Sequence, residues 1–201
     1  ASLWSAASEG DAALAQALRQ ANMPRKDLTL LLSKAERAAI AFQELERAVK
    51  SKELWRKTAD AYGASGLVDD QLRCLRSLAA TLDTMKRPTE ALECRSEAIA
   101  IARKTDRISV AADIVMSLIQ SYRDQNDPQN ALEGLNELVP LVTSTRNSRQ
   151  AAEALEARGS LLVELSHPEE AIADFRSALD KFTTLVGDIW AAGRVSLELA
   201  G

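Results

Sequence analysis

The sequence predicts an all-α fold, an array of antiparallel helical hairpins with about nine to ten helices. A proline recurs at Pro88, Pro128 and Pro168, which are evenly spaced, and an Ala-aliphatic pair follows each proline at the same offset. A fixed period in this range is typical of helical repeat arrays. Hydrophobic residues make up 46% of the chain and aromatic residues only 4%, a composition that suits closely packed helices.

Apolar residues at three- and four-residue spacing mark the individual helices, because this spacing lines one face of a helix. The predicted helices begin at capping residues or proline and end at glycine or before proline. In chain order they cover residues 8–21, 27–45, 51–63, 69–82, 88–104, 107–125, 128–143, 148–165, 168–186 and 188–200.

Several residues set these boundaries. Ser8 or Asp11 is the expected cap of the first helix, and Ser51 begins the third. Gly63 and Gly66 end the third helix, because glycine enters a left-handed C-cap freely. Pro140 lies inside the helix 128–143 and is expected to kink it or to loosen its last turn.

The period divides the chain into units within a single predicted domain, residues 1–201. Clear repeats cover 67–106, 107–146 and 147–187, degenerate repeats cover 8–66, and 188–201 is a partial unit. Because short turns join the helices, neighbours are expected to be antiparallel, and each hairpin must bury its apolar face against the next. The mid-unit ends suggest that this chain is part of a longer protein.

Small and aromatic residues recur at fixed places in the clear units. The unit 147–187 has Leu155, Gly159 and Leu162 in its first helix and Ala171, Phe175 and Ala178 in its second. This pattern resembles the tetratricopeptide repeat (TPR). The unit 107–146 matches with Leu118, Tyr122, Ala131 and Leu135, whereas in the unit 67–106 Arg95 stands where the family has an aromatic residue.

The resemblance implies a right-handed α-α superhelix. The 40-residue unit is longer than the common 34-residue unit and is similar to that of kinesin light chains and bacterial peptide-sensing regulators. An α-α superhelix of another type, such as a HEAT-like or 14-3-3-like stack, is the alternative fold.

The overall composition excludes some classes of partner. The formal net charge of −4 leaves no basic excess to neutralise phosphates, so nucleic acid is not an expected partner. No apolar run has the length of a transmembrane helix, and membrane insertion is not expected. The two cysteines, Cys74 and Cys94, fit a reducing compartment better than a disulfide scaffold, and the expected location is the cytoplasm.

The sequence contains no pattern of a catalytic, cofactor or metal site. His167 is the only histidine, so a Ser/His/Asp or Cys/His arrangement has little to draw on, and it lies in a predicted turn. Carboxylate pairs such as Glu153 and Glu156 lie on exposed helix faces rather than in a pocket that would shift their pKa values. There is no phosphate-binding glycine loop and no zinc-ligand spacing. We therefore expect no enzyme, no cofactor and no bound metal.

The resemblance implies that ligands lie on the concave face, along exposed residues of the first helix of each unit. Around Arg73 and Arg76 this face is expected to be basic, and around Glu153, Glu156 and Glu164 acidic. The candidate partner-binding residues are Glu36, Gln43, Arg73, Arg76, Asp83, Asp113, Met116, Gln120, Arg123, Glu153, Glu156, Ser160 and Glu164.

The expected function is that of a non-catalytic scaffold or adaptor that binds a peptide or helix of a partner protein. A two-signed groove favours a partner of matching charge pattern. The alternative is a ligand- or peptide-sensing regulatory module of a larger signalling protein. Self-association through the terminal hairpins is a further option, with Trp4 and Trp190 on the candidate faces.

Overall fold

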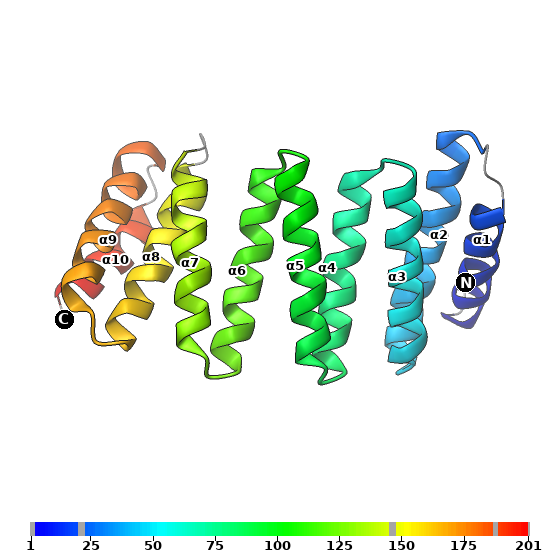
Figure 1. Cartoon of the computed structure of the whole chain (residues 1–201), viewed down its shortest axis with the longest axis horizontal. Coiled ribbons are helices and arrows are strands. Elements are labelled where there is room, and N and C mark those ends of the chain that lie inside the picture. Colours follow the sequence, from blue (N-terminus) through cyan, green and yellow to red (C-terminus); the bar gives the residue numbers. More distant parts are fainter. Residues whose placement is uncertain (1–2, 20–22, 145–147, 187–188, 201) are drawn as a thin grey trace. The chain divides into compact units, whose positions relative to one another are not determined.

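The computed structural model describes residues 3–19, 23–144, 148–186 and 189–200, and over these residues the chain is helical with no strand (Figure 1). Antiparallel helices follow one another along the chain, as the all-α prediction requires. The helices are α1 (Leu3–Arg19), α2 (Arg25–Glu44), α3 (Ala48–Ala64), α4 (Val68–Thr84), α5 (Pro88–Lys104), α6 (Ile108–Asp124), α7 (Pro128–Thr143), α8 (Ser148–Glu164), α9 (Pro168–Asp180), the π-helical segment η1 (Lys181–Val186) and α10 (Ile189–Ala200).

Single helices recur along the chain at half the interval at which the proline motif recurs in the sequence. Helices α3, α4, α5 and α6 each have 17 residues, and turns of equal length separate them, so helices begin at even intervals at Ala48, Val68, Pro88 and Ile108. A signal for this half period lies in the sequence, because alanine recurs at the same place in both helices of each hairpin. These buried alanines are Ala91, Ala111, Ala131, Ala151, Ala171 and Ala191.

The turns share one backbone conformation, which also recurs with the half period. In the turn after α4, the Arg87 amide donates to the Leu82 carbonyl and the Lys86 amide donates to the Asp83 carbonyl, each at 3.0 Å. This pair of bonds is the Schellman motif, and it places one residue in the left-handed region. Among the described residues, those at positive φ are Glu46, Gly66, Lys86, Asp106, Asn126 and Ser166. Only one of them is glycine, so most of these turns could not be predicted from glycine.

The first helix begins earlier than predicted. Helix α1 begins at Leu3 rather than at Ser8, and it continues through Gly10. A β-carbon on Gly10 would lie 2.1 Å from Ala38 Cβ and 2.7 Å from the Lys34 carbonyl oxygen. Gly10 is therefore a point of close helix packing against α2, not part of a helix start.

Three other boundaries also differ from the prediction. Helix α3 begins at Ala48 rather than at Ser51, which is fully buried inside the helix. Helix α7 continues past Pro140 to Thr143, whose hydroxyl donates to the Val139 carbonyl at 2.8 Å. The predicted helix 168–186 is α-helical only to Asp180, and its last six residues form η1.

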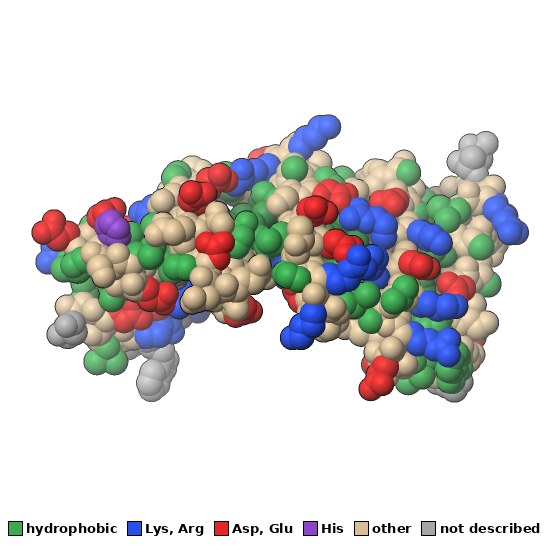
Figure 2. Space-filling model, turned by 60° about the horizontal axis from the view of Figure 1, so that its bottom comes forward, with side chains coloured by type: hydrophobic (Ala, Val, Ile, Leu, Met, Phe, Trp, Pro, Cys, Tyr) green, Lys and Arg blue, Asp and Glu red, His purple; other side chains and the backbone are tan. Residues whose placement is uncertain are grey.

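The chain divides into two compact units, unit 1 (Ala1–Ile101) and unit 2 (Ala102–Gly201). Unit 1 carries 15 Lys and Arg against 14 Asp and Glu, and unit 2 carries 10 against 15, so the acidic excess belongs to unit 2. Figure 2 accordingly shows Lys and Arg side chains gathered over unit 1. None of the described helices combines the length and the hydrophobicity that a bilayer-spanning helix requires.

Candidate functional site

The thirteen predicted site residues lie on α2 and α4 in unit 1 and on α6 and α8 in unit 2, which are the first helices of their repeats. We call the solvent-facing side of these four helices the A-helix surface and describe it separately in each unit. Each of the thirteen side chains is exposed or half-buried, as a surface site requires. Their part in binding stays a prediction, whereas their contacts can be described.

In unit 1, Glu36 is the centre of a polar cluster. Tyr62 Oη donates to Glu36 Oε1 at 2.6 Å, and the Arg73 guanidinium donates to both carboxylate oxygens at 2.8 and 3.1 Å. Arg73 also lies 2.7 Å from Asp70 Oδ1. Burial, followed by the hydrogen bond to Glu36, raises the pKa of Tyr62 above its usual value, and the bond to Glu36 raises the pKa of Arg73. Glu36 and Arg73 therefore join α2 to α4.

Asp83 holds a buried cation. Arg95 is 6% exposed and occupies the position at which the TPR pattern has an aromatic residue. Its guanidinium forms an ion pair with Asp83 of the neighbouring helix α4. The aliphatic stem of Arg95 thus fills the core position while its charge reaches a half-exposed carboxylate. Asp83 has a structural role in the hairpin α4–α5.

In unit 2, polar contacts join successive first helices. Gln150 Nε2 donates to Asp113 Oδ1 at 2.8 Å, and Arg123 forms an ion pair with Glu164, so α6 is joined to α8 twice. Helix α8 is joined to α10 by Arg194, which donates to Glu156 Oε2 at 2.7 Å, and by Ser160, whose Oγ lies 3.0 Å from Glu198 Oε2.

The partners Gln150, Arg194 and Glu198 are absent from the predicted set. The sequence separation between each of these residues and its partner could have identified them. The contacts join residues 37 to 41 positions apart, which is about one repeat. Side chains of opposite charge or of donor and acceptor type at this separation could have been found in the sequence.

These contacts change the expected charge of the A-helix surface. In unit 1, Arg73 is compensated by Glu36 and Asp70, so the basic region reduces to Arg76, an exposed residue with no carboxylate within 4 Å among the described residues. The remaining expected basic side chain is therefore isolated rather than part of a patch.

The acidic region in unit 2 is reduced in the same way, because Arg194 and Arg123 compensate Glu156 and Glu164. Two carboxylates keep much of their charge. Asp113 accepts a hydrogen bond from a neutral amide, and among the described residues the cation within 4 Å of Glu153 is Arg149, at 3.6 Å. Burial raises the pKa of Glu153, and repulsion from Glu156 and Asp113 acts in the same direction, although Arg149 and Arg194 oppose it. Asp113 and Glu153 thus form an acidic pair on α6 and α8.

His167, Cys74 and Cys94, the described groups most suited to nucleophilic or acid–base chemistry, are not among the predicted site residues. His167 is exposed in a turn, with Nδ1 3.2 Å from Glu170. Cys74 and Cys94 are free and buried, and burial raises the pKa of the Cys94 thiol to about 11, so neither is a ready nucleophile. Within the described residues, no group of three or more His, Cys, Asp or Glu side chains could hold a metal ion.

The sequence matches no protein-family model and no curated protein. The structure, however, is similar to solved helical repeat proteins. BtubC (BKLC) from P. vanneervenii is 16% identical and matches with a TM-score of 0.65, covering 89% of this chain and 72% of its own. A kinesin light chain-type protein of Podosopora anserina with nearly identical TPR-like repeats is also 16% identical, with a TM-score of 0.62, covering 91% and 89%.

A third similar structure is the Rap conjugation gene regulator of the plasmid pLS20 in complex with the Phr* peptide. It is 15% identical and has a TM-score of 0.57, and the match covers 96% of this chain and 52% of the regulator. The helical hairpins, the 40-residue unit and these similarities agree with one another and confirm the predicted fold class. The fold of this chain is therefore that of tetratricopeptide-type helical repeats, with 40-residue units.

Proposed function

We propose that this chain is a non-catalytic interaction scaffold that binds a peptide or helix of a partner protein on its A-helix surface. The observation that carries the proposal is the acidic pair Asp113 and Glu153 of unit 2, which remains when the surrounding charges are compensated between helices. The raised pKa of Glu153 means that a nearby cation would stabilise its charged form. A Lys or Arg side chain of a partner supplies such a cation.

The cross-helix contacts support a preformed binding surface. Glu156, in the middle of α8, is only 12% exposed and is held by Arg194, while Arg123 and Glu164 join the C-terminal end of α8 to α6. A surface whose framing side chains are already fixed loses less conformational entropy when a ligand binds. The side chains between these contacts, including Met116 and Gln120, are then the ones that determine partner choice.

An affinity measurement tests this proposal. The whole chain is first used to capture partner proteins. Basic peptides from these partners are then compared, and the dissociation constant of the tightest one is measured by fluorescence polarisation. We expect the double variant D113N/E153Q to weaken binding about tenfold or more, which corresponds to about 1.4 kcal/mol. The matched control E133Q/E169Q removes two exposed charges from the second helices α7 and α9 and should leave affinity unchanged. Equal affinity of D113N/E153Q and the parent protein would place the site elsewhere.

A ligand- or peptide-sensing regulatory module is the second candidate function. It is supported by the similarity to the Rap regulator solved with the Phr* peptide. A sensor must change conformation on binding, so X-ray scattering with and without saturating peptide distinguishes the two functions. If the dimensions of the protein do not change at saturating peptide, the scaffold function is retained and the sensor function is rejected.

Location and self-association belong to the proposal as well. Two free buried cysteines suit a reducing compartment, and we propose the cytoplasm. Trp4 is 53% exposed, and the guanidinium carbon of Arg47 lies 4.5 Å from its ring centroid, so part of this candidate contact face is already covered. The side chain of Trp190 lies outside the described residues.

A further inference from the structure

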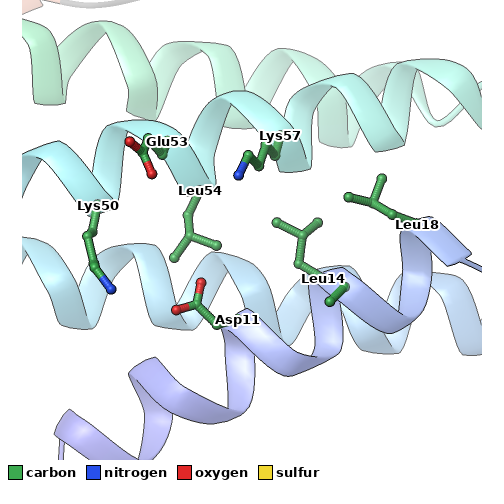
Figure 3. A pocket seen from close by; sticks show the side chains of 8 residues that line it. Asp11, Leu14, Leu18, Lys50, Glu53, Leu54 and Lys57 are labelled. Atoms are coloured by element: carbon green, nitrogen blue, oxygen red, sulfur yellow. The ribbon is translucent and has the colours of Figure 1, made fainter.

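We propose a second docking surface, in unit 1, where the groove between α1 and α3 binds an acidic amphipathic helix of a partner protein. Helices α1 and α3 flank the first helix α2 along the chain and so occupy the second-helix position of the repeat, which makes this groove separate from the A-helix surface. Figure 3 shows the two helices with the side chains that line a cavity of about 170 Å³ between them. The α1 and α3 groove is defined by Asp11, Leu14, Ala15, Leu18, Lys50, Glu53, Leu54 and Lys57.

The floor of the groove is apolar. Leu14 and Leu54 are each 4% exposed and lie at its base, whereas Leu18 is 58% exposed at one end. Leu18 also lines an adjoining cavity of about 530 Å³, together with Met23 and Leu28. The apolar surface therefore extends along α1 past the first cavity, and a partner side chain that covered Leu18 would remove a large leucine from water.

At Lys57 the rim of the groove departs from the charge pattern of the second helices α5 and α7. On α5 and α7 the same register position is acidic, and Glu97 and Glu137 accept ion pairs from arginines of the preceding second helix, α3 or α5. One repeat earlier, at the equivalent place on α3, the residue is Lys57. The sign of the charge that faces the preceding helix is reversed at this groove.

Lys50 shows the same reversal. Its equivalent on α5 is Glu90, which accepts from Lys52 at 3.1 Å. Neither Lys50 nor Lys57 has a carboxylate within 4 Å among the described residues, although Asp11 and Glu53 line the same cavity. Lys50 Nζ instead lies 5.4 Å from the centroid of the Phe42 ring. The two lysines are thus cations placed where α5 has carboxylates with partners, Glu90 and Glu97.

The spacing of these lysines indicates the partner's chemistry. They are seven positions apart, or about two turns and roughly 10.5 Å along α3. A helix lying along the groove would meet both with carboxylates seven residues apart, and leucine-like side chains between them would cover Leu14, Leu18 and Leu54. Docking of an amphipathic helix in a groove between helices is a recurrent mode of recognition. Opposite charges on the two sides would fix its register along the groove.

A designed peptide tests this inference with the whole chain. The probe is a helical peptide of about five turns, or roughly 18 residues, with two Glu seven residues apart and Leu between them. Its control carries Gln at both Glu positions. We expect the Glu peptide to bind and the Gln peptide to bind at least tenfold more weakly in fluorescence polarisation. Binding should also weaken at least tenfold in K50E/K57E and in L18D, and a Lys version of the peptide should regain affinity for K50E/K57E.

The control variant K26E/K34E makes the same charge change on exposed lysines of α2 and should leave binding unchanged. D113N/E153Q should also leave binding of the designed peptide unchanged, because its substitutions lie on the A-helix surface. A failure of this inference can therefore be distinguished from a failure of the proposed function. Absence of peptide binding, or equal weakening in K50E/K57E and K26E/K34E, would overturn the inference. So would a concentration-dependent dimer in sedimentation that L18D abolishes, since a second copy would then be the occupant.

Discussion

The ring of Phe175 fills the space that the missing side chain of Gly159 leaves. A β-carbon on Gly159 would lie 2.7 Å from Cε1 and 2.8 Å from Cδ1 of Phe175, closer than real β-carbons approach other atoms. Phe175 is 1% exposed. The small residue on α8 and the aromatic residue on α9 thus close this hairpin.

Replacing Phe175 by Ala should therefore be strongly destabilising. We expect the free energy of unfolding to fall by about 3–5 kcal/mol, because the substitution removes buried area and leaves a cavity beside Gly159. Urea denaturation followed by circular dichroism measures it. Arg176→Ala, at the exposed neighbouring position, is the control and should change stability by about 0.5 kcal/mol or less. A loss in Phe175→Ala no larger than that of the control would mean that the ring is not part of the core.

A second prediction concerns Arg95, whose buried guanidinium depends on Asp83. Asp83→Asn removes the opposite charge, and we expect a loss of about 1–3 kcal/mol, at the lower end because Asp83 is 40% exposed. In the background Arg95→Met this loss should largely disappear, since no buried charge remains. A double-mutant cycle by urea denaturation measures the difference. Equal losses in both backgrounds would show that Asp83 acts independently of Arg95.

Ser51 gives a third prediction, in the opposite direction. It occupies the helix position at which Ala91 and the later buried alanines stand, and its hydroxyl is buried with no hydrogen-bond partner among the described residues. Ser51→Ala removes an unsatisfied polar group and should stabilise the protein by about 1 kcal/mol. Thermal unfolding should show a higher midpoint. A lower midpoint would mean that the hydroxyl has a partner, such as a buried water.

The sequence predicts features that depend on residue type at fixed positions. Pro88 and Pro168 lie at the first position of a helix, as expected, and Gly66 has positive φ. Lys86 adopts the same turn without being glycine, because its φ is imposed by the backbone bonds that close the helix and by burial of Leu82. Such a turn depends on tertiary packing, which local residue preferences do not contain.

The site was less predictable for a related reason. Repeat register places Glu36 and Arg73 on the surface, and their separation of about one repeat makes them a candidate pair, but it does not show that they bind each other. That contact depends on how far α2 and α4 are rotated about their axes. A residue that binds a ligand and a residue that joins two helices therefore occupy the same register positions in the sequence. The distances between side chains in the structure are needed to distinguish the two roles.

The last prediction concerns alkaline pH. Burial raises the pKa of Cys94 from 9.0 to about 11, and it raises the pKa of Cys74 in the same direction. In the unfolded chain a thiol loses its proton near pH 9, whereas in the folded chain it keeps the proton to higher pH. The stabilisation is therefore complete below pH 9 and is lost as the pH rises toward about 11.

For Cys94 alone, the loss amounts to about 2–3 kcal/mol at most, since each pKa unit is worth about 1.4 kcal/mol. Urea midpoints between pH 8 and pH 11 in the presence of a reductant measure it. Cys94→Ala should remove the part of the pH dependence of stability that is due to this thiol. Cys74, and Tyr62 above pH 10, should still make stability fall as the pH rises. An identical pH dependence in Cys94→Ala and the parent protein would show that the thiol is accessible to water in the folded state.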